Sequence, residues 1–472
     1  MALPEAGEPA RDERADYDYA TDDVRRSGLV ADLQERVTGE VRFDEYTRQL
    51  YATDASAYEV PPVGVVFPSS TDDVATVMAY CAAREIPVLP RGGGTSLAGQ
   101  AVNEAVVLDF TRYMDDLVAV DPDEALATAQ PGVVLGELDQ ALEAYDLKFA
   151  PDPAWGDKSA LGGAIGNNST GAHSLKYGKT DAYVEECEVV LADGTVTTFG
   201  EVSRDELRER ADRDGDLEAR IYAEVARILD EEADAVREAY PTLKRNVSGY
   251  NLDRLVDEAE DGRVNLARLL AGSEGTLAVV TEATVALEPV PETKSMALFA
   301  YADLLDAMAD VAPILDHDPA AVEVLDDVLL DLARDTEEFA DVVEMLPPGT
   351  DSVLLVEFYA EDDAEGREKV AALRADREGD DEPSVAAMEA HEKDERARFW
   401  KLRKSGLPIL LSRTSDEKHI GFIGDAAVPP ENLPEYVSDF QDVLAENDTF
   451  ASFYAHAGPG CLHVRPLVNT KS

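Results

Sequence analysis

The sequence predicts an α+β fold organised as two domains, and two observations carry this expectation. From Val63 to Phe110, short apolar runs alternate with an amphipathic helix in the order strand, helix, strand, as in a βαβ unit. After Pro289-Val290-Pro291 the pattern changes to longer helices over residues 303–345 and one alternating strand, Ser352 to Tyr359. A change of this kind marks a domain boundary. A second α+β domain is therefore expected to begin near residue 292.

The elements of the first part can be placed in order. An N-terminal extension, residues 1–45, carries one helix around Gly28 to Val37. Ser70 is a typical N-cap, and apolar residues then follow with the spacing i, i+3, i+4 and i+7 of a helix: Val74, Val77, Met78 and Cys81. The other expected elements are strands at Val63 to Phe67, Ile86 to Leu89 and Val106 to Phe110, a hairpin from Leu117 to Ala129, a helix from Val134 to Tyr145, a hairpin from Cys187 to Phe199 with a two-residue turn at Asp193-Gly194, helical structure over residues 201–239, and a strand from Leu277 to Leu287.

The composition is strongly acidic. The chain has 472 residues, with 98 Asp and Glu against 42 Lys and Arg, for a formal net charge of −56. A protein with this negative charge repels nucleic-acid phosphates and anionic membranes. The composition therefore excludes a protein that binds nucleic acid through its phosphate backbone. Because 45% of the residues are apolar and the acids are spread along the chain, the composition indicates a folded protein rather than a disordered one. An acid-rich, lysine-poor surface resembles that of proteins from halophiles.

No segment approaches the ~18 consecutive apolar residues that cross a membrane. The stretch Met1 to Asp23 is acidic and has no signal-peptide core. The three cysteines, Cys81, Cys187 and Cys461, are too scattered for a disulfide framework or a CxxC metal site. A cytoplasmic location is therefore expected.

Three clusters of Gly, Ser, Thr and Asn stand at the ends of apolar segments in the first domain. They are Pro90 to Gln100 (with Arg-Gly-Gly-Gly-Thr-Ser at 91–96), Ser159 to Gly171, and Ala271 to Thr276. Adjacent glycines let the backbone approach a ligand closely, and their N–H groups can bind an anion. None of the clusters matches the GxxxxGK[ST] loop of nucleotide hydrolases, and a GxGxxG dinucleotide motif is absent. Taken singly, each cluster could be an ordinary turn, but together they favour loops that converge on one large polar ligand.

The order of these motifs resembles the vanillyl-alcohol-oxidase-type FAD enzymes, within them the branch of D-lactate dehydrogenases, the glycolate oxidase FAD subunit and D-2-hydroxyglutarate dehydrogenase. The resemblance runs from about Tyr46 to the C-terminus. It implies a two-subdomain FAD-binding domain over residues 46–291 and an α+β substrate cap over residues 292–472. Because Thr95 and Ser96 follow the glycines where some relatives carry a His, FAD is expected to be bound non-covalently. The implied cofactor-binding residues are Arg91, Gly92, Gly93, Gly94, Thr95, Ser96, Gly99, Gly163, Asn168, Ser169, Gly171, Glu274 and Gly275.

The resemblance also implies how the cap holds a substrate carboxylate. Arg403 falls where the family places an Arg for this purpose, and a planar guanidinium suits a bidentate contact with a carboxylate. The alternative is that Arg403 belongs to a basic helix face. Lys418 is a weaker candidate for the same task, and Arg465 could also meet a carboxylate.

Two histidines lie close together in the segment from His456 to Pro466. The Gly-Pro-Gly turn at residues 458–460 can fold His456 back beside His463, and strand alternation puts Cys461, His463 and Arg465 on one face. Two neutral imidazoles are more often structural than metal ligands. The resemblance reverses that balance, because metal-dependent members of the family use the two His of a His-x-Gly-Asp-Gly-Asn-Leu-His motif. It therefore implies a divalent metal, Zn or Mn, at His456 and His463.

The chain stops nine residues after His463. The family's Glu-His-Gly motif, which supplies a third ligand, normally lies further on, so the metal site is expected to be incomplete and the cap truncated. The expected activity is that of an FAD-dependent dehydrogenase acting on the CH–OH group of a D-2-hydroxy acid, and D-lactate is the favoured substrate. Electrons would pass to an iron–sulfur, quinone or cytochrome acceptor, and a partner could hold the protein at the inner face of the membrane. The alternatives are an FAD-binding subunit that is inactive without a downstream chain, and a glycolate, D-2-hydroxyglutarate, alcohol or sugar oxidase.

Overall fold

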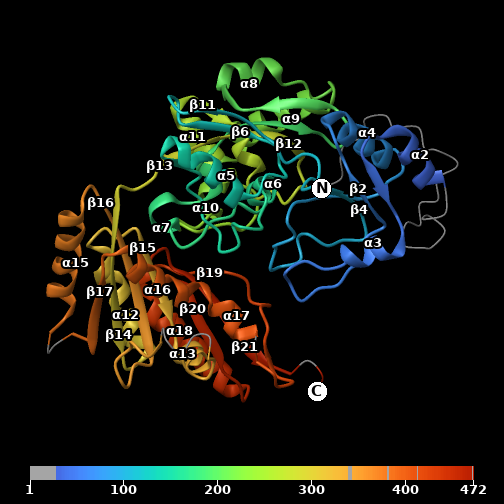
Figure 1. Ribbon diagram of the computed structural model, residues 1–472. Helices are drawn as coiled ribbons and strands as arrows, with labels where there is room; N and C mark the ends of the chain where they lie inside the picture. Colours follow the sequence, from blue (N-terminus) through green and yellow to red (C-terminus); the bar gives the residue numbers. More distant parts are fainter. Residues whose placement is uncertain (1–27, 338–342, 380–381, 412, 470, 472) are drawn as a thin grey trace. The chain divides into compact units, whose positions relative to one another are not determined.

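The chain divides into two units in the computed structural model (Figure 1), which describes residues 28–337, 343–379, 382–411, 413–469 and 471. The first unit comprises the residues up to Ser169 together with Lys179–Pro241 and Val247–Pro289. The second comprises Thr170–Gly178, Thr242–Asn246 and Val290–Ser472. Residues 1–27 of the expected N-terminal extension lie outside the described residues, and its expected helix is α2 (Gly28–Arg36). No helix among the described residues is long and apolar enough to cross a membrane.

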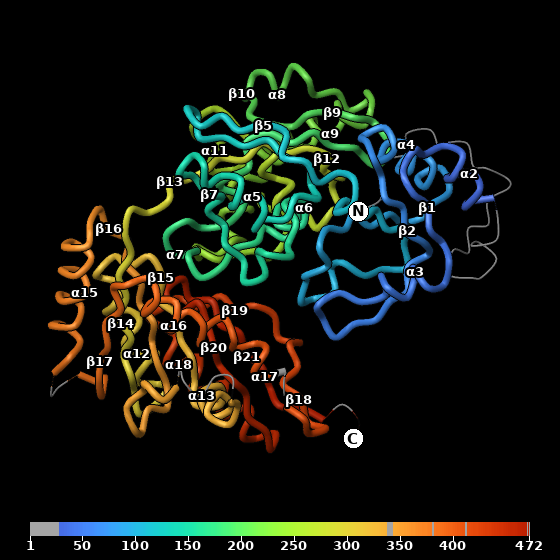
Figure 2. Tube along the Cα trace, in the orientation of Figure 1, coloured from blue at the N-terminus to red at the C-terminus, as the bar shows by residue number. Residues whose placement is uncertain are grey.

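The first sheet of the first unit contains the predicted strand–helix–strand pattern. Its strands lie in the order β1 (Glu40–Arg42), β2 (Gly64–Phe67), β4 (Val106–Asp109) and β3 (Val88–Arg91), and β4 pairs in parallel with both β2 and β3. The crossover between β2 and β3 is α4 (Thr71–Ala82), whose N-cap Ser70 accepts a hydrogen bond from the backbone N–H of Asp73. The apolar face of α4 is buried against α2 and the sheet, as the helical spacing predicts. The tube in Figure 2 shows this sheet beside α2 and α3 (Glu45–Leu50).

The second sheet of the first unit is antiparallel, in the order β5 (Leu117–Asp121), β6 (Leu126–Ala129), β12 (Val279–Ala286), β8 (Val184–Val190) and β9 (Val196–Phe199). The β8–β9 hairpin has a three-residue loop and not the expected two-residue turn, because Leu191 N–H donates to the carbonyl of Thr195 at 2.8 Å. Gly194 takes the left-handed position (φ +89°) that such loops require. The other elements of this unit are α5 (Leu135–Leu142), β7 (Leu147–Lys148), α6 (Leu161–Asn167), β10 (Glu201–Ser203), α8 (Arg204–Arg210), α9 (Leu217–Arg227), α10 (Ala233–Ala239), α11 (Leu252–Glu258), β11 (Arg263–Asn265) and β13 (Glu288–Pro289).

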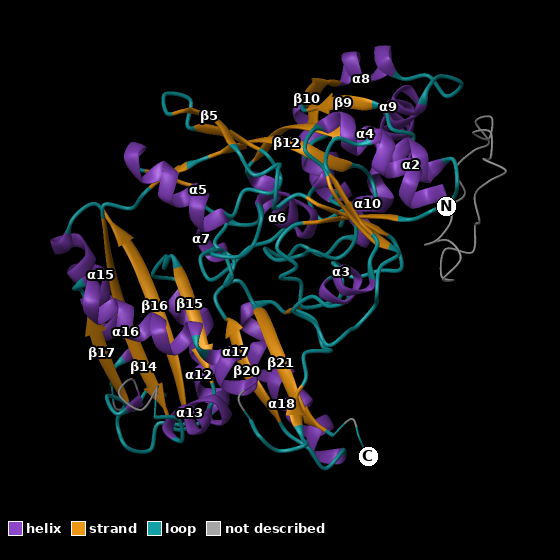
Figure 3. Cartoon of the chain, turned by 45° about the vertical axis from the view of Figure 1, so that its right-hand side comes forward, coloured by secondary structure: helices purple, strands orange, loops and turns teal. Residues whose placement is uncertain are grey.

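The second unit is built on one large sheet with helices on both faces (Figure 3). Its strands lie in the order β17 (Ala386–Ala390), β14 (Thr293–Tyr301), β16 (Ser352–Ala360), β15 (Ala321–Leu325), β20 (Ala451–His456), β21 (Cys461–Val468) and β18 (Lys418–His419), with β19 (Ala426–Ala427) also paired to β21. One face packs on α12 (Leu304–Leu315), α15 (Asp363–Arg377) and α18 (Leu433–Glu446). The other face packs on α13 (Asp327–Arg334), α16 (Lys393–Lys404) and α17 (Gly406–Leu411).

The expected strand from Ser352 to Tyr359 is present as β16. Both of its faces are buried, because Val353 and Leu355 contact one helical layer while Leu354 and Val356 contact the other. One expectation about the second unit is wrong. Strand β15 interrupts the helices expected over residues 303–345. A five-residue apolar run cannot be told from part of a buried helix by its periodicity. The α+β class itself is confirmed.

Asp326 joins β15 and α13 to the neighbouring strand β20. Its buried carboxylate accepts hydrogen bonds from the N–H of Leu329 at 3.1 Å, the hydroxyl of Ser452 at 2.9 Å and the N–H of Phe453 at 2.5 Å. Burial raises the pKa of Asp326 to about 7. The folded protein therefore retains this proton at pH values where the unfolded chain has released it.

The raised pKa of Asp326 predicts a pH effect on stability. From roughly pH 4 to pH 7 the folded state binds more protons than the unfolded state at this residue, so its contribution to stability falls as the pH rises. We expect Asp326→Asn to remove this component. The measurement is the urea midpoint at pH 5 and pH 7.5, with Asp335→Asn, an exposed change at the end of α13, as the control. An unchanged difference between the two pH values in Asp326→Asn would contradict the assignment.

Candidate functional site

The three glycine-rich loops of the first unit lie against one another. A Cβ on Gly92 would lie 2.8 Å from Cβ of Ala160, and one on Gly93 would lie 1.9 Å from the carbonyl oxygen of Lys158. A Cβ on Gly275 (φ +74°) would lie 2.5 Å from the ring of Pro90. At these positions only glycine allows the backbones to approach so closely. The structure therefore brings the predicted loops together.

Polar contacts also join the loops. The hydroxyl oxygens of Thr95 and Ser159 are 2.9 Å apart. The amide of Gln100 donates to Oε1 of Glu274 at 3.3 Å and to Oδ1 of Asn167 at 3.4 Å. These bonds hold the first loop over the other two.

The first loop carries a row of hydrogen-bond donors without protein acceptors. Within the described part of the chain, the backbone N–H groups of residues 92–96 form no hydrogen bond. Gly163 is next to them, because its backbone nitrogen would lie 3.7 Å from a Cβ on Gly92, and a Cβ on Gly163 itself would meet no atom within 4 Å. Successive unpaired amides beside open space form an anion-binding concavity. This donor set fits the diphosphate of FAD.

Other predicted cofactor residues stabilise the loops through protein contacts. Arg91 donates to the carbonyls of Ala101 at 2.7 Å and Thr53 at 2.9 Å, and burial lowers its pKa. Asn168 is buried in a left-handed conformation (φ +50°), and its Oδ1 accepts from the N–H of Asp181 at 2.9 Å. A Cβ on Gly94 (φ +65°) would meet the Arg91 guanidinium, and one on Gly99 (φ +84°) would meet the ring of Tyr58. The hydroxyl of Ser96 donates to the side-chain amide oxygen of Gln100, that of Ser169 accepts a hydrogen bond from the side-chain amide of Asn167, and Gly171 belongs to the second unit.

In the second unit, a polar row crosses the sheet face that packs on α16. Glu323 pairs with His456 across β15 and β20, and Tyr454 pairs with His463 across β20 and β21. Directly paired residues share a face, and residues two apart on a strand do as well. The predicted placement of His463, Cys461 and Arg465 on one face follows from this register. The rings of His456 and His463 are 4.9 Å apart between centroids, so the turn at residues 457–460 folds the two together as expected.

His456 is fixed by a buried carboxylate. Its Nδ1 lies 2.8 Å and 2.9 Å from the two carboxylate oxygens of Glu323 and 3.4 Å from Nη2 of Arg403. Burial and the nearby cations Arg245 and Arg403 lower the pKa of His456 well below its usual value. The imidazole is therefore neutral at pH 7. A neutral imidazole oriented by a carboxylate is the arrangement that metal-binding histidines adopt.

His463 has the same relation to Asp425. Its Nδ1 lies 2.7 Å from Oδ1 of Asp425, and Arg245 donates to Oδ2 at 3.2 Å. Burial alone would raise the pKa of Asp425, but His463 and Arg245 lower it well below its usual range. The donor atoms of Asp425, Cys461 and His463 all lie within 4.8 Å of one another, which is compatible with a cation bound beside the imidazoles. Burial raises the pKa of the Cys461 thiol, so the thiol is protonated when no cation is bound.

The three predicted carboxylate-binding residues lie in different environments. Arg403 is buried, and its Nε donates to Oε2 of Glu323 at 2.6 Å. Arg465 is also buried; its Nη1 donates to the carbonyl of Ile423 at 3.3 Å, while its Nε finds no partner among the described residues. Both guanidinium groups lie over the ring of Tyr454, at 5.3 Å and 5.9 Å. Lys418 is exposed and donates to the carbonyl of Arg413, and no contact joins it to the other two.

Sequence reasoning missed the carboxylates behind the histidines. Glu323 stands in an apolar strand, Ala-Val-Glu-Val-Leu, where a charged residue between buried neighbours was a usable signal. A second pair was missed as well: Nε2 of His173 lies 2.8 Å from Oε1 of Glu357, and the indole of Trp400 donates to Oε2 at 2.7 Å. His173 is 184 residues away from Glu357 in sequence, so no local pattern could have joined them.

Known families match both parts of the chain. Residues 62–200 match the family described as FAD binding domain, and residues 290–472 match the C-terminal domain of FAD linked oxidases. By structure, the chain is similar to an alkyldihydroxyacetonephosphate synthase (TM-score 0.64, 16% identity, covering 93% of this chain and 79% of that one). It is also similar to 4-ethylphenol oxidase from Gulosibacter chungangensis (TM-score 0.63, 17% identity, covering 98% and 85%). At these identities the likeness concerns the fold alone.

Three curated relatives resemble the chain in sequence. D-2-hydroxyglutarate dehydrogenase of Pseudomonas putida is 30% identical over 97% of this chain, which spans 45% of the relative's length. Glycolate oxidase subunit GlcD of Bacillus subtilis is 30% identical over 92% of this chain and 80% of the relative. D-lactate dehydrogenase of Archaeoglobus fulgidus is 29% identical over 90% and 79%. The chain thus spans less than half the length of the first of these. The two matched domains, together with 30% identity to a relative of which this chain covers 80%, show that the chain belongs to the family of FAD-linked oxidases.

Proposed function

We propose that this chain is an FAD-dependent dehydrogenase that oxidises a D-2-hydroxy acid to the 2-oxo acid, with D-lactate as the first candidate substrate. One observation carries the proposal: the neutral imidazole of His456 and the imidazole of His463, each within hydrogen-bond distance of a carboxylate, lie on one sheet face beside two buried guanidinium groups. A 2-hydroxy acid presents a hydroxyl and a carboxylate on adjacent carbons, and this arrangement offers a partner for each.

Different residues of the second unit would bind the carboxylate and the hydroxyl of the substrate. The guanidinium groups of Arg403 and Arg465 orient the substrate carboxylate, since their remaining N–H groups suit a planar anion. When no cation is bound, Nε2 of the neutral His456 accepts the hydrogen bond of the α-hydroxyl and takes its proton as the carbonyl forms, with His463 beside it. Bound FAD would supply the two-electron acceptor for the hydride that leaves the α-carbon. Lys418, which is exposed, would have at most a peripheral role.

A divalent cation, Zn or Mn, is part of the proposal. His456 and His463 would hold it through Nε2, with Cys461 or a further chain completing the set. The donor atoms that lie within 4.8 Å of one another belong to His463, Cys461 and Asp425, and His456 is not among them. Such a cation would supply Lewis-acid polarisation of the hydroxyl. The metal content of the purified protein, measured by mass spectrometry before and after chelation, tests this part alone.

The remaining features of the proposal concern acceptor and setting. We propose an iron–sulfur, quinone or cytochrome acceptor, a cytoplasmic location that a partner could bring to the membrane, and a halophilic source for the acidic surface. Glycolate and D-2-hydroxyglutarate remain alternative substrates, because relatives with those names are as similar as the D-lactate dehydrogenase. A chain that binds FAD but needs a downstream segment for activity is a second candidate, since the first relatives are about twice as long.

Anaerobic bleaching of the flavin absorbance tests the function. We expect D-lactate to bleach the flavin of the FAD-loaded protein, with L-lactate and glucose as controls and glycolate and D-2-hydroxyglutarate as competing substrates. His463→Ala should abolish the bleaching while leaving the flavin content unchanged. Protein that binds no FAD would refute the proposal; protein that binds FAD but is bleached by none of the acids would favour the incomplete-subunit alternative.

A further inference from the structure

A cavity in the second unit gathers lysines in a chain that has few. The cavity has a volume of about 600 Å³. Its 16 lining residues include Lys176, Lys244 and Lys369, three of only 12 lysines in the whole sequence. All of the lining residues belong to the second unit, although they come from seven separate stretches of the chain: residues 175–176, 242–244, 315–320, 359, 369, 429–431 and 458–459.

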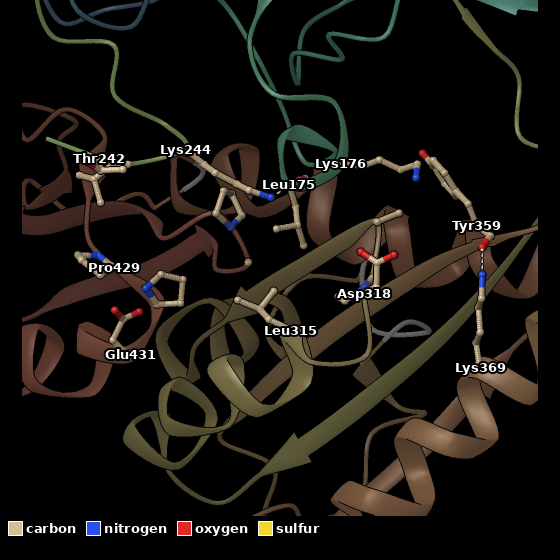
Figure 4. Close-up of a pocket in the computed structure, with 16 residues that line it drawn as sticks. Leu175, Lys176, Thr242, Lys244, Leu315, Asp318, Tyr359, Lys369, Pro429 and Glu431 are labelled. Carbon is tan, nitrogen blue, oxygen red and sulfur yellow. Dashed lines mark hydrogen bonds between the residues drawn. The ribbon is translucent and has the colours of Figure 1, made fainter. Parts of the chain in front are cut away.

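Gly458 and Pro459, in the turn that follows His456, line the cavity, but the two histidines do not. Figure 4 shows the lysines on its wall, with Lys176 extending toward Tyr359 and Lys369 rising from α15 to the carbonyl of Tyr359. The opposite wall comes from the end of α12 at Leu315 and from the segment at Pro429 and Glu431 that precedes α18. These helices cover the sheet face opposite to the one that carries His456 and His463.

The lysine charges are incompletely neutralised by the protein. The ammonium group of Lys244 donates to the carbonyl of Leu175 at 3.0 Å, and that of Lys369 donates to the carbonyl of Tyr359 at 2.8 Å. A carbonyl satisfies a donor but carries no charge. Lys369 also pairs with Glu365 at 2.8 Å, whereas Lys176 and Lys244 have no carboxylate within 4.0 Å in the described part of the chain.

The charge of the lining contrasts with that of the chain. Asp318 and Glu431 are the acidic residues of the lining, so the cavity carries a net charge of +1 in a protein of net charge −56. Lys176 and Lys244 are exposed and Lys369 is half-buried, and their ammonium groups attract a ligand of opposite charge. A cavity of this volume fits a small organic molecule.

We propose that this cavity binds a small organic anion that carries at least two carboxylate or phosphate groups, contacted by Lys176 and Lys244 and by Lys369 at the rim. The four prolines of the wall have no N–H to offer, so recognition rests on the ammonium groups, which act as point charges rather than as planar forks. Leu175, Leu243 and Leu315 contact the carbon skeleton of the ligand. This site is additional to the substrate site and does not depend on the proposed function.

Calorimetric titration of the FAD-loaded full chain with citrate and with pyrophosphate tests the proposal, and saturation with FAD keeps pyrophosphate from the glycine loops. We expect saturable binding of at least one probe. A higher affinity for citrate identifies a polycarboxylate ligand, and a higher affinity for pyrophosphate identifies a phosphorylated ligand. Lys176→Gln together with Lys244→Gln should weaken binding at least about tenfold. Glu431→Gln should tighten it, because it removes a like charge from the wall.

The matched control is Lys393→Gln, a change at an exposed lysine at the start of α16 that lines no part of the cavity. It should bind the probe like the parent. Unchanged thermal midpoints and an unchanged content of bound flavin would show that the variants are folded. The proposal is overturned if the parent binds neither probe, or if the double lysine variant binds as tightly as Lys393→Gln.

Discussion

Replacing Arg403 with alanine is expected to destabilise the second unit by about 3–5 kcal/mol and to abolish flavin bleaching by substrate. Glu323 is completely buried, and Arg403 is the cation that pairs with it, at 2.6 Å. Burial already raises the pKa of Glu323, and the guanidinium opposes the rise. Without Arg403 the carboxylate must remain charged in an apolar setting or take up a proton, and either change disturbs the bond that orients His456.

Urea unfolding followed by tryptophan fluorescence measures the loss, since Trp400 lies on α16 one turn from Arg403. The double variant Arg403→Met with Glu323→Gln removes both charges, so it should recover most of the stability but none of the activity. Lys404→Ala, at the exposed neighbouring position, is the surface control. An Arg403→Ala protein that unfolds at the parent's urea midpoint would show that the pair contributes nothing.

Alanine at Gly163 is expected to separate folding from cofactor binding. A Cβ there meets no atom within 4 Å, and the residue lies within α6. Alanine should therefore stabilise the FAD-free protein by about 0.5–1 kcal/mol through its helix propensity. If the diphosphate lies beside this position, the same methyl group should weaken FAD binding at least about tenfold, or by ~1.4 kcal/mol.

Gly93→Ala is the comparison, and its expected behaviour differs. Its Cβ would lie 1.9 Å from a backbone carbonyl of the neighbouring loop, so the loops must move apart even in the absence of FAD. We expect both stability and FAD affinity to fall in Gly93→Ala. Flavin fluorescence titration and thermal unfolding of the two variants check the pair of results. Equal FAD affinity in Gly163→Ala and the parent would place the cofactor elsewhere.

Local signals explain which parts of the fold the sequence could predict. The N-cap at Ser70 and the helical spacing of Val74, Val77 and Cys81 depend only on neighbours in sequence, and α4 forms where they indicate. Strand β15 was missed because its five residues are all buried and show no alternation. Its place is set by pairing with β16 and β20, which lie far along the chain.

The candidate site follows the same division. The glycine loops and the two histidines could be identified because these residue types seldom cluster within a few positions of one another in a sequence. The partners that fix them could not: Glu323 is 133 residues from His456, and Arg245 is 180 residues from Asp425. An isolated Glu or Arg in an acidic chain looks like a surface residue. Only the folded chain shows that sheet register places Glu323 beside His456 and that a loop places Arg245 beside Asp425.

The second unit is not a removable module. The family match to its main part is continuous over residues 290–472, yet the chain crosses between the units five times, because Thr170–Gly178 and Thr242–Asn246 also belong to the second unit. A gene fragment that starts at Val290 would leave Glu357 without His173 and Asp425 without Arg245. Evolution or engineering can therefore exchange this unit between relatives only together with two short insertions in the partner sequence.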